Sequence, residues 1–473
     1  MNHKAEMESF VLTASQEIPP PPQIQEVNGE HITSHPHSLL VTKYMGSKKP
    51  ILSFVIGEIV RWVRRGDLVV DLLAGTHTIG YALKPLCRIV ANDIQKYSLV
   101  LGRALLNYSA QAPITEEFLS TFRRYFFHNM RHLNALFAPG LELEQQFLYD
   151  RSSRSFSPVR YWQFCQEYPH YLKPHLGEGW EEEFALLFSP ERIAAYAALN
   201  CLEPYSLFSL YYANAYLGVR QAAEVDSVRY AIDKMCNEWI PHHPHYRYDG
   251  ELMRSLLLTA LIMVLNHINV APGHWASIPR IKESNWSWVV SQRRLSVIDL
   301  FHQKVKHLVE ELPKVDSPYA PHMVTAMDYE EFLNRHPEVL RQARVIYVDP
   351  PYSQAHYSRF YHILETLVLY DYPPIEHSGR YRKSRFQSAF AKKTRVEKAL
   401  EKICRAAQES GSILIISYSQ GGVIPNDEAF RALLEKFYPS SAIQLKLLPT
   451  RHSRLGRSQR LNTHAYLFTC LPS

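Results

Sequence analysis

Residues 68–76 read Leu-Val-Val-Asp-Leu-Leu-Ala-Gly-Thr, an apolar run that is followed by a glycine loop. Apolar runs of this length, bounded by turn residues, are typical of buried strands in parallel sheets. A second strand is predicted at 88–91, one helix length further on, and it ends at Asn92-Asp93. The separation of about twenty residues between Asp71 and Asp93 is that of one βαβ unit in a nucleotide-binding sheet. The stretch therefore predicts an α/β fold.

The alternation of strand and helix signals stops after this unit and returns late in the chain. The intervening region is rich in aromatic residues and in apolar residues at helical spacing, which predicts a mostly helical insertion. Further strands are predicted at 322–326, 345–348, 412–416 and 464–468. We therefore divide the chain into a flexible Pro-rich arm at 1–38, a first sheet part at 39–104, a helical insertion at 105–290 and a second sheet part at 291–473.

Composition excludes some broad classes of protein. The 473 residues are 46% hydrophobic and 12% aromatic, which is enough for several packed cores and excludes a disordered or fibrous chain. The formal net charge of +6 is compatible with a polyanionic partner but does not require one. The apolar run at 256–265 is too short to span a bilayer, and the polar start at 1–10 lacks an export signal. We expect a soluble, cytoplasmic protein without a membrane partner.

Neither cysteine nor histidine spacing predicts a metal site. The six cysteines lie far apart and form no Cys-x-x-Cys pair, so buried single thiols in a reducing compartment are expected. His242, His243 and His245 are close in sequence but have no acidic or thiol companion, and the prolines between them prevent helical spacing. A loop without metal is the favoured interpretation.

The strongest chemical signal is the sequence Asp349-Pro350-Pro351-Tyr352, directly after the predicted strand at 345–348. Its chance occurrence in a chain of this length is on the order of one in a hundred. Its position also matters, because ligands of an open parallel sheet bind beyond the carboxyl ends of the strands. The alternative is a plain strand-ending turn, which Asp-Pro-Pro also favours.

Five features in this order make the chain similar to the AdoMet-dependent DNA adenine methyltransferases of the alpha class, the group that contains the GATC-methylating enzymes. The features are Lys43-Tyr44-Met45-Gly46-Ser47-Lys48, Asp71-Leu72-Leu73-Ala74-Gly75, Asp93, Asp328 and Asp349-Pro350-Pro351-Tyr352. The similarity extends from about residue 40 to the end. It implies a Rossmann-like AdoMet-dependent methyltransferase sheet, a target-recognition insertion, double-stranded DNA as substrate, a location at the nucleoid, and a restriction-modification or defence context with partner proteins.

The four residues 349–352 suit the chemistry of an exocyclic amine. The lone pair of such an amine is delocalised into the ring, so acceptors for its hydrogens are needed to localise it. The Asp349 carboxylate and the Pro350 carbonyl can be those acceptors, and Pro351 helps to stiffen the backbone that aims them. Tyr352 offers a face for a base that has been flipped out of the duplex. The resemblance assigns the same roles to these residues.

The cofactor residues follow from the same comparison. Gly75 allows a close approach of backbone to ligand, and an acidic residue at the end of the second strand suits ribose hydroxyls. Taken singly, each aspartate is better explained as a helix cap or a solvated charge at a strand end, whereas together and in order they favour the site. The resemblance assigns AdoMet binding to Tyr44, Lys48, Asp71, Gly75, Asp93 and Asp328.

One residue departs from the family pattern. His77 stands where the glycine loop usually has a second glycine. Its side chain is expected either to crowd the methionine part of the donor or, if the loop bends differently, to point into the target pocket. We interpret His77 as tolerated rather than catalytic.

Candidate nucleic-acid contacts lie in two regions. The basic, aromatic stretch after residue 379 suits phosphate contact, with a solvated charged loop as the alternative. In the insertion, the stretch 211–224 and the segment 273–275 contain side chains able to contact bases, with plain core as the alternative. The predicted phosphate contacts are Arg380, Arg382, Lys383 and Arg385.

Two other functions remain open at this stage. An enzyme of the same fold could methylate RNA adenine or the N4 amine of DNA cytosine, because Asp-Pro-Pro-Tyr constrains the amine more than the polymer. Alternatively, the chain is a catalytically retired DNA-binding module, an idea that rests only on His77.

Overall fold

The computed structural model describes most of the chain from residue 51 onward. The described residues are 51–109, 114–150, 152, 156–174, 180–198, 203–243, 250–271, 273–354, 356–452 and 461–472. The predicted arm at 1–38 and the cofactor candidates Tyr44 and Lys48 lie outside them.

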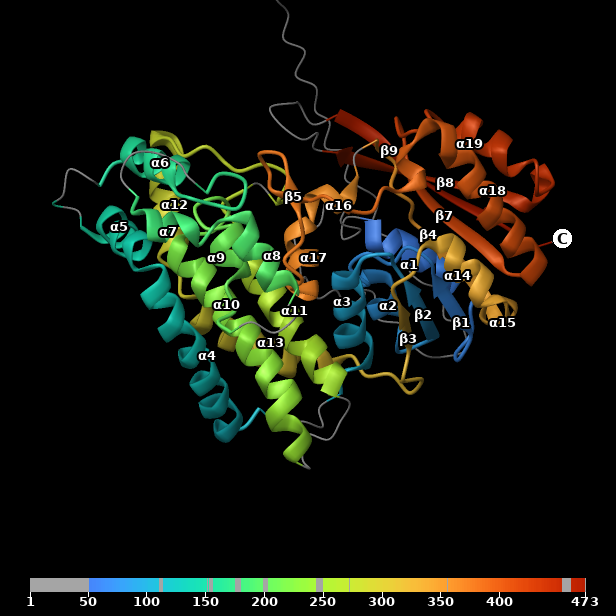
Figure 1. Ribbon diagram of the computed structural model, residues 1–473. Helices are drawn as coiled ribbons and strands as arrows, with labels where there is room; N and C mark the ends of the chain where they lie inside the picture. Colours follow the sequence, from blue (N-terminus) through green and yellow to red (C-terminus); the bar gives the residue numbers. More distant parts are fainter. Residues whose placement is uncertain are drawn as a thin grey trace, which may run out of the picture.

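Within the described residues, one sheet contains the strands β1 (Leu68–Asp71), β2 (Arg88–Asn92), β3 (Met323–Thr325), β4 (Ala343–Val348), β7 (Ile413–Ser419), β8 (Ile443–His452) and β9 (Leu461–Cys470). Their order is β3-β2-β1-β4-β7-β9-β8 (Figure 1). The first five strands in this order run parallel, whereas β9 is antiparallel to both β7 and β8. Chain order reverses between β1 and β4, and open α/β sheets bind ligands at such a switch point.

Helices cover both faces of the sheet because the strands are apolar on both sides. Val69 of β1 packs with one helical layer and its neighbour Val70 with the other. The first layer contains α1 (Leu52–Val60), α2 (Thr78–Leu83) and α3 (Lys96–Asn107). The second contains α14 (Tyr329–Arg335), α15 (Pro337–Gln342), α18 (Lys393–Ser410) and α19 (Asp427–Leu434). The predicted α/β class with a mostly parallel sheet is confirmed.

A helical region lies between α3 and β3 in sequence and beside the sheet in space (Figure 1). Its helices are α4 (Glu116–Leu136), α5 (Ala138–Tyr149), α6 (Pro158–Glu167), α7 (Glu182–Leu186), α8 (Pro190–Ala198), α9 (Leu207–Tyr211), α10 (Val219–Lys234), α11 (Gly250–Ile268), α12 (Trp286–Arg293) and α13 (Val297–Glu311). The boundary that we placed at residue 290 falls inside α12. The helices continue through α13 because its apolar face, which includes Leu300 and Leu308, is buried in the shared core.

The central helix of this region is α11, which packs against α3, α10 and α13. It is the one helix among the described residues that is long and apolar enough to cross a membrane. Of its most apolar window, 78% is buried inside the protein. This burial explains why α11 is apolar on all sides, since a helix enclosed by others needs no polar face.

The segment that follows β4 joins the sheet to the helical region. It contains α16 (Tyr357–Phe360), α17 (His362–Leu369) and a hairpin of β5 (Ile375–Glu376) and β6 (Tyr381–Arg382). The hydroxyl of Tyr370 donates to buried Asp226 of α10 at 2.6 Å. Glu365 of α17 accepts from the backbone N–H groups of Lys96 and Tyr97 at the start of α3, at 3.0 and 3.1 Å. The two parts of the chain are thus connected by buried polar contacts as well as by apolar packing.

The described cysteines are buried free thiols, and the described part of the chain contains no group of three or more His, Cys, Asp or Glu side chains able to hold a metal ion. His243 stacks on Trp239 and its Nδ1 lies 2.8 Å from the Trp239 carbonyl oxygen. Cys201 and His245 lie outside the described residues.

Candidate active site

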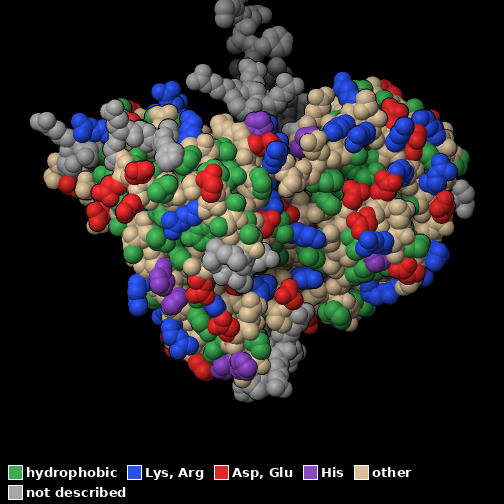
Figure 2. Space-filling model, viewed as in Figure 1, with side chains coloured by type: hydrophobic (Ala, Val, Ile, Leu, Met, Phe, Trp, Pro, Cys, Tyr) green, Lys and Arg blue, Asp and Glu red, His purple; other side chains and the backbone are tan. Residues whose placement is uncertain are grey.

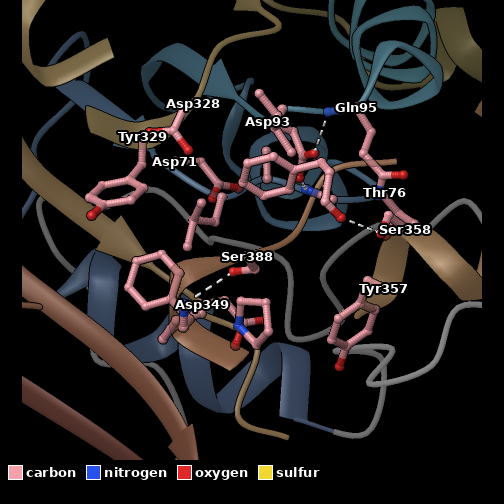
Figure 3. A pocket seen from close by; sticks show the side chains of 18 of the residues that line it. Asp71, Thr76, Asp93, Gln95, Asp328, Tyr329, Asp349, Tyr357, Ser358 and Ser388 are labelled. Atoms are coloured by element: carbon pink, nitrogen blue, oxygen red, sulfur yellow. Dashed lines mark hydrogen bonds between the residues drawn. The ribbon is translucent and has the colours of Figure 1, made fainter. Parts of the chain in front are cut away.

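A cavity of about 1090 Å³, partly open to solvent, lies at the carboxyl ends of the parallel strands. The loops after β1, β2, β3 and β4 all contribute to it, so the predicted catalytic and cofactor residues that the structure describes converge on one space. In Figure 3, Asp71, Asp93, Asp328 and Asp349 surround the cavity. Among the described residues that line it, these four are aspartates and none is Lys or Arg. The cavity therefore favours a cationic ligand over a phosphate.

The glycine loop and Asp93 hold each other in place. The backbone of Gly75 has φ +53°, in the left-handed region, and its N–H donates to Oδ2 of Asp93 at 3.0 Å. Oδ1 of Asp93 accepts from the N–H of Gln95 at 2.9 Å. Burial raises the pKa of Asp93, and the N–H donors of Gln95, Gly75 and Ile94 oppose that rise. Asp93 thus fixes the loop while it lines the cavity.

Two further residues order the strand ends. Asn92, which is fully buried, donates to the carbonyls of Leu72 and Met327 at 3.2 and 3.0 Å and accepts from the Thr325 hydroxyl at 2.7 Å. It thereby joins the loops that follow β1, β2 and β3. Asp328 caps α14 by accepting from the Glu330 N–H at 2.9 Å and also lines the cavity. Asp328 can cap the helix and contact a ligand at the same time, because its carboxylate has two oxygens.

His77 neither crowds the cavity nor points into it. Its backbone keeps the left-handed conformation, with φ 58°, that a glycine adopts at low cost. Its side chain is fully buried against α3, where Nε2 lies 2.7 Å from the Ser98 carbonyl oxygen. Gly102 of α3 makes the room, since a Cβ at that position would lie 2.5 Å from Cε1 of His77. Burial lowers the pKa of His77 to about 4.

Asp349 lies at the end of β4 and lines the cavity with Pro350, Pro351 and Tyr352. Its Oδ1 accepts from the Ser417 hydroxyl of the neighbouring strand β7 at 2.7 Å. The carboxylate is therefore oriented from the sheet side. Ser417 is not among the residues predicted from the sequence, although a polar residue directly after the apolar run 413–416 was the available signal.

Tyr352 is half-buried at the cavity wall. Its carbonyl accepts from the Val423 N–H at 2.8 Å, and its ring lies edge-on to Tyr418 with centroids 6.5 Å apart. Burial raises the pKa of Tyr352, so the hydroxyl stays protonated at neutral pH. The backbone after Pro351 is thus held by the loop that follows β7.

The four predicted phosphate contacts differ in exposure. Arg380 is buried, its guanidinium donates to the carbonyls of Tyr211 and Ala213, and burial lowers its pKa to about 10. Arg382 is also buried and makes a bidentate ion pair with Asp371 at 2.6 and 2.7 Å. These internal contacts give both arginines a structural role and argue against phosphate contact.

The other two predicted contacts lie nearer the surface. Arg385 is partly exposed and pairs with Glu376 at 2.5 Å, while Lys383 is exposed. Of the four, Lys383 is the residue best placed to meet a polyanion.

The candidate base contacts in the insertion are core residues. Tyr211, Tyr212, Tyr216 and Trp275 are fully buried. Arg220 pairs with Glu224 and also donates to the carbonyls of residues 293–295. The core alternative fits these segments, because their aromatic rings are buried and the Arg220 guanidinium binds within the protein.

No family model matches the chain. Over 391 residues, the chain is 21% identical to "Modification methylase LlaI" of Lactococcus lactis subsp. lactis, an alignment that covers 82% of this chain and 47% of the relative. Over 125 residues it is 27% identical to "Type II methyltransferase M.FokI" of Planomicrobium okeanokoites, with 26% of this chain and 19% of the relative covered. The chain thus spans less than half the length of either relative. Most of the chain is similar, at low identity, to a modification methylase.

Proposed function

We propose that this chain is a site-specific DNA methyltransferase that transfers a methyl group from AdoMet to the N6 amine of a flipped-out adenine in a restriction-modification or phage-defence system. The similarity to two modification-type methyltransferases supports this reaction class. The observation that carries the proposal is the shared cavity, into which both the turn 349–352 and the glycine loop open. A donor and an acceptor amine must meet in one enclosed space for transfer to be fast.

The charge of the cavity fits AdoMet. This donor carries a sulfonium and an ammonium against one carboxylate and is therefore a net cation, and when bound it supplies an electrophilic methyl group. Four aspartates and no Lys or Arg among the described lining residues match a cation. A nucleoside triphosphate would need cations for its phosphates, and none of the described lining residues is Lys or Arg.

The proposed donor contacts follow from the types of side chain. Asp93 would accept from ribose hydroxyls and Asp328 from the adenine amine. The rings of Tyr329 and Phe390, with centroids 5.0 Å apart, form an aromatic wall next to Asp328 that suits a purine. Gly75, Asp71, Tyr44 and Lys48 complete the proposed donor site.

The acceptor amine would bind at the turn 349–352. Asp349 and the Pro350 carbonyl accept its two hydrogens and localise the nitrogen lone pair, which makes the amine a nucleophile. Tyr352 would stack on the flipped base. The phosphate contact that we now propose is Lys383, because it is the exposed member of the basic stretch.

The test is methyl transfer by the purified chain. Methyl-labelled AdoMet is supplied with duplex DNA, single-stranded DNA or structured RNA, and the products are digested to nucleosides and identified by mass spectrometry. Asp349→Ala is the diagnostic variant, and Asp299→Ala, an exposed aspartate on α13, is the matched control. AdoMet affinity is measured for each protein by calorimetry.

The expected result is N6-methyladenine in duplex DNA, with activity lost in Asp349→Ala, kept in Asp299→Ala, and similar AdoMet affinity throughout. N4-methylcytosine or labelled RNA would replace the substrate assignment by one of the alternatives. Absence of AdoMet binding together with tight DNA binding would support the retired module.

A further inference from the structure

A buried chain of hydrogen bonds leads from the sheet interior to Asp349. The Tyr347 hydroxyl lies 3.0 Å from Oγ of Ser417, and the Ser417 hydroxyl donates to Oδ1 of Asp349 at 2.7 Å. Tyr347 and Ser417 are each about 1% exposed. They lie on the neighbouring strands β4 and β7, whose register pairs Val348 with Ile416, immediately before Asp349 and Ser417.

The donor in each of these two hydrogen bonds follows from the chemistry of the three side chains. A serine hydroxyl has one hydrogen, and Ser417 gives it to the carboxylate, which can only accept when it is ionised. The hydroxyl of Tyr347 must therefore be the donor to Ser417. Burial, with the charges of Asp349 and Asp71 as further causes, raises the pKa of Tyr347 well above its ordinary value, so that hydrogen is retained at neutral pH.

We propose that Ser417 and Tyr347 are positioning residues that orient the Asp349 carboxylate toward the acceptor amine. This inference rests on the proposed function, because it assigns a purpose to the orientation of Asp349. A donor to the charged form of a carboxyl group favours that form. The two prolines that follow Asp349 offer no N–H of their own, so the Ser417 hydroxyl of the neighbouring strand serves as a donor to the carboxylate.

The other titratable groups around Asp349 do not compete for this role. Tyr352 and Tyr357 face it from the turn and from α16, and burial raises the pKa of both. Asp71 of β1 lies on the far side of Tyr347 and acts on that hydroxyl. The tyrosines therefore stay neutral throughout the acidic range in which carboxyl groups titrate.

The experiment compares the variants Ser417→Ala, Ser417→Thr and Tyr347→Phe with the parent. Ser412→Ala is the matched control, because Ser412 is a buried serine next to the opposite end of β7 that donates to the carbonyls of Leu340 and Ala343. The first readout needs no activity: the carboxyl ¹³C signal of Asp349 is followed against pH and assigned with Asp349→Asn. The second is single-turnover methyl transfer against pH at saturating AdoMet and DNA.

We expect Ser417→Ala to raise the midpoint of the Asp349 titration by about one pH unit and to slow transfer about 10- to 100-fold, the effect of one lost hydrogen bond to a charged group. Tyr347→Phe should change the titration midpoint and the transfer rate in the same direction but by less. Ser417→Thr, which keeps the hydroxyl, should give the parent values of both. AdoMet and DNA affinities should stay within about twofold, since neither hydroxyl is proposed to touch a ligand. Ser412→Ala should lower thermal stability without changing either readout.

An unchanged Asp349 titration in Ser417→Ala would overturn the inference whether or not the protein methylates DNA. A chain that shows the titration shift but transfers no methyl group to any nucleic acid would retain the positioning role and lose the proposed function. The two failures are thus separable.

Discussion

Replacing Gly102 by alanine probes the unusual glycine loop from outside the cavity. Gly102 lies inside α3, where exchange of glycine for alanine ordinarily stabilises a helix by about 1 kcal/mol. Here the added Cβ would lie 2.5 Å from Cε1 of His77 and 2.7 Å from Cγ1 of Val324. Neither neighbour is the end of a long flexible side chain, and both belong to buried or half-buried positions.

The expected sign is therefore the reverse of the ordinary one. Overpacking of a close-packed core costs about 1–3 kcal/mol, and contacts this short place Gly102→Ala in the upper part of that range. After subtraction of the helix-propensity gain, the net destabilisation should be about 1–2 kcal/mol. Because the clash pushes His77 and the loop toward the cavity, AdoMet affinity should fall as well.

A double-mutant cycle with His77→Gly isolates the contact. Glycine at 77 removes the imidazole and suits the left-handed backbone at φ 58°. In that background the contact with Cγ1 of Val324 remains and the helix-propensity gain opposes it, so Gly102→Ala should change stability by no more than about 0.5 kcal/mol. The coupling energy with His77 is then about 1–2 kcal/mol. Gly57→Ala in α1, where a Cβ would meet nothing within 4 Å, is the control and should stabilise by about 0.5–1 kcal/mol.

The assay is urea denaturation, with coincident fluorescence and circular dichroism transitions required before free energies are compared. Two outcomes would contradict the prediction: Gly102→Ala stabilises the protein as Gly57→Ala does, or it costs the same free energy with and without the His77 imidazole. Either outcome would mean that His77 does not occupy the space that Gly102 leaves.

Three further predictions concern pH, charge and the donor. Burial lowers the pKa of His77 from 6.5 to about 4, so the stability that the neutral imidazole contributes is complete above pH 6.5 and is lost as the pH falls through 4. Over that range the free energy of unfolding of the parent should fall by up to about 3 kcal/mol more than that of His77→Gly. An equal dependence of the two unfolding free energies on pH would contradict this prediction. Lys383→Ala should make the plot of log DNA affinity against log salt concentration shallower by about one unit of slope. Arg382→Ala should instead lower the melting temperature, because it breaks the ion pair with Asp371. The reverse result for the two variants would support Arg382 as the phosphate contact. Asp93→Asn should weaken AdoMet binding about 10-fold or more in calorimetry. The N–H groups of Gly75 and Gln95 and the ribose hydroxyls together need two acceptor oxygens, whereas an amide has only one. Unchanged affinity would mean that Asp93 does not contact the donor.

The fold was largely predictable because its central strands are apolar on both sides. Each of β1, β2, β4 and β7 is a short apolar run followed by a polar residue, which is the expected pattern of a strand covered by helices. By contrast, β8 was not predicted, since it lies at the sheet edge and mixes Lys446 and exposed Leu447 with buried Ile443. The two-residue strands β5 and β6 carry too few residues for any periodicity to be detected.

The composition of the site was predictable but the direction of its side chains was not. The order of motifs was enough to bring Asp71, Asp93, Asp328 and Asp349 to one edge, because parallel strands share their carboxyl ends. Whether an arginine is exposed depends on what packs above it. Arg382 is buried because Asp371, eleven residues earlier, folds back across it, and spacing alone does not give that contact.

The net charge of +6 conceals a separation of charges that bears directly on function. Over the face in Figure 2, basic and acidic side chains are mixed. At the cavity they are sorted: four aspartates line the inside. His356 also lines the cavity, and burial together with the nearby cations Lys392, Arg385 and Arg359 lowers its pKa, so positive charge lies near this part of the cavity wall, which we call the rim, while the aspartates line the inside.

A protein that must bind a cationic donor and a polyanionic substrate a few ångströms apart needs this division, because a cation inside would repel the donor and an acidic rim would repel the phosphates. Reversal of one rim charge, as in Arg359→Glu, should accordingly weaken DNA binding at low salt while AdoMet affinity in the absence of DNA stays unchanged. Equal losses for both ligands would mean that the rim and the cavity are one electrostatic unit. That result would remove the charge argument on which the choice of AdoMet over a phosphate-bearing cofactor depends.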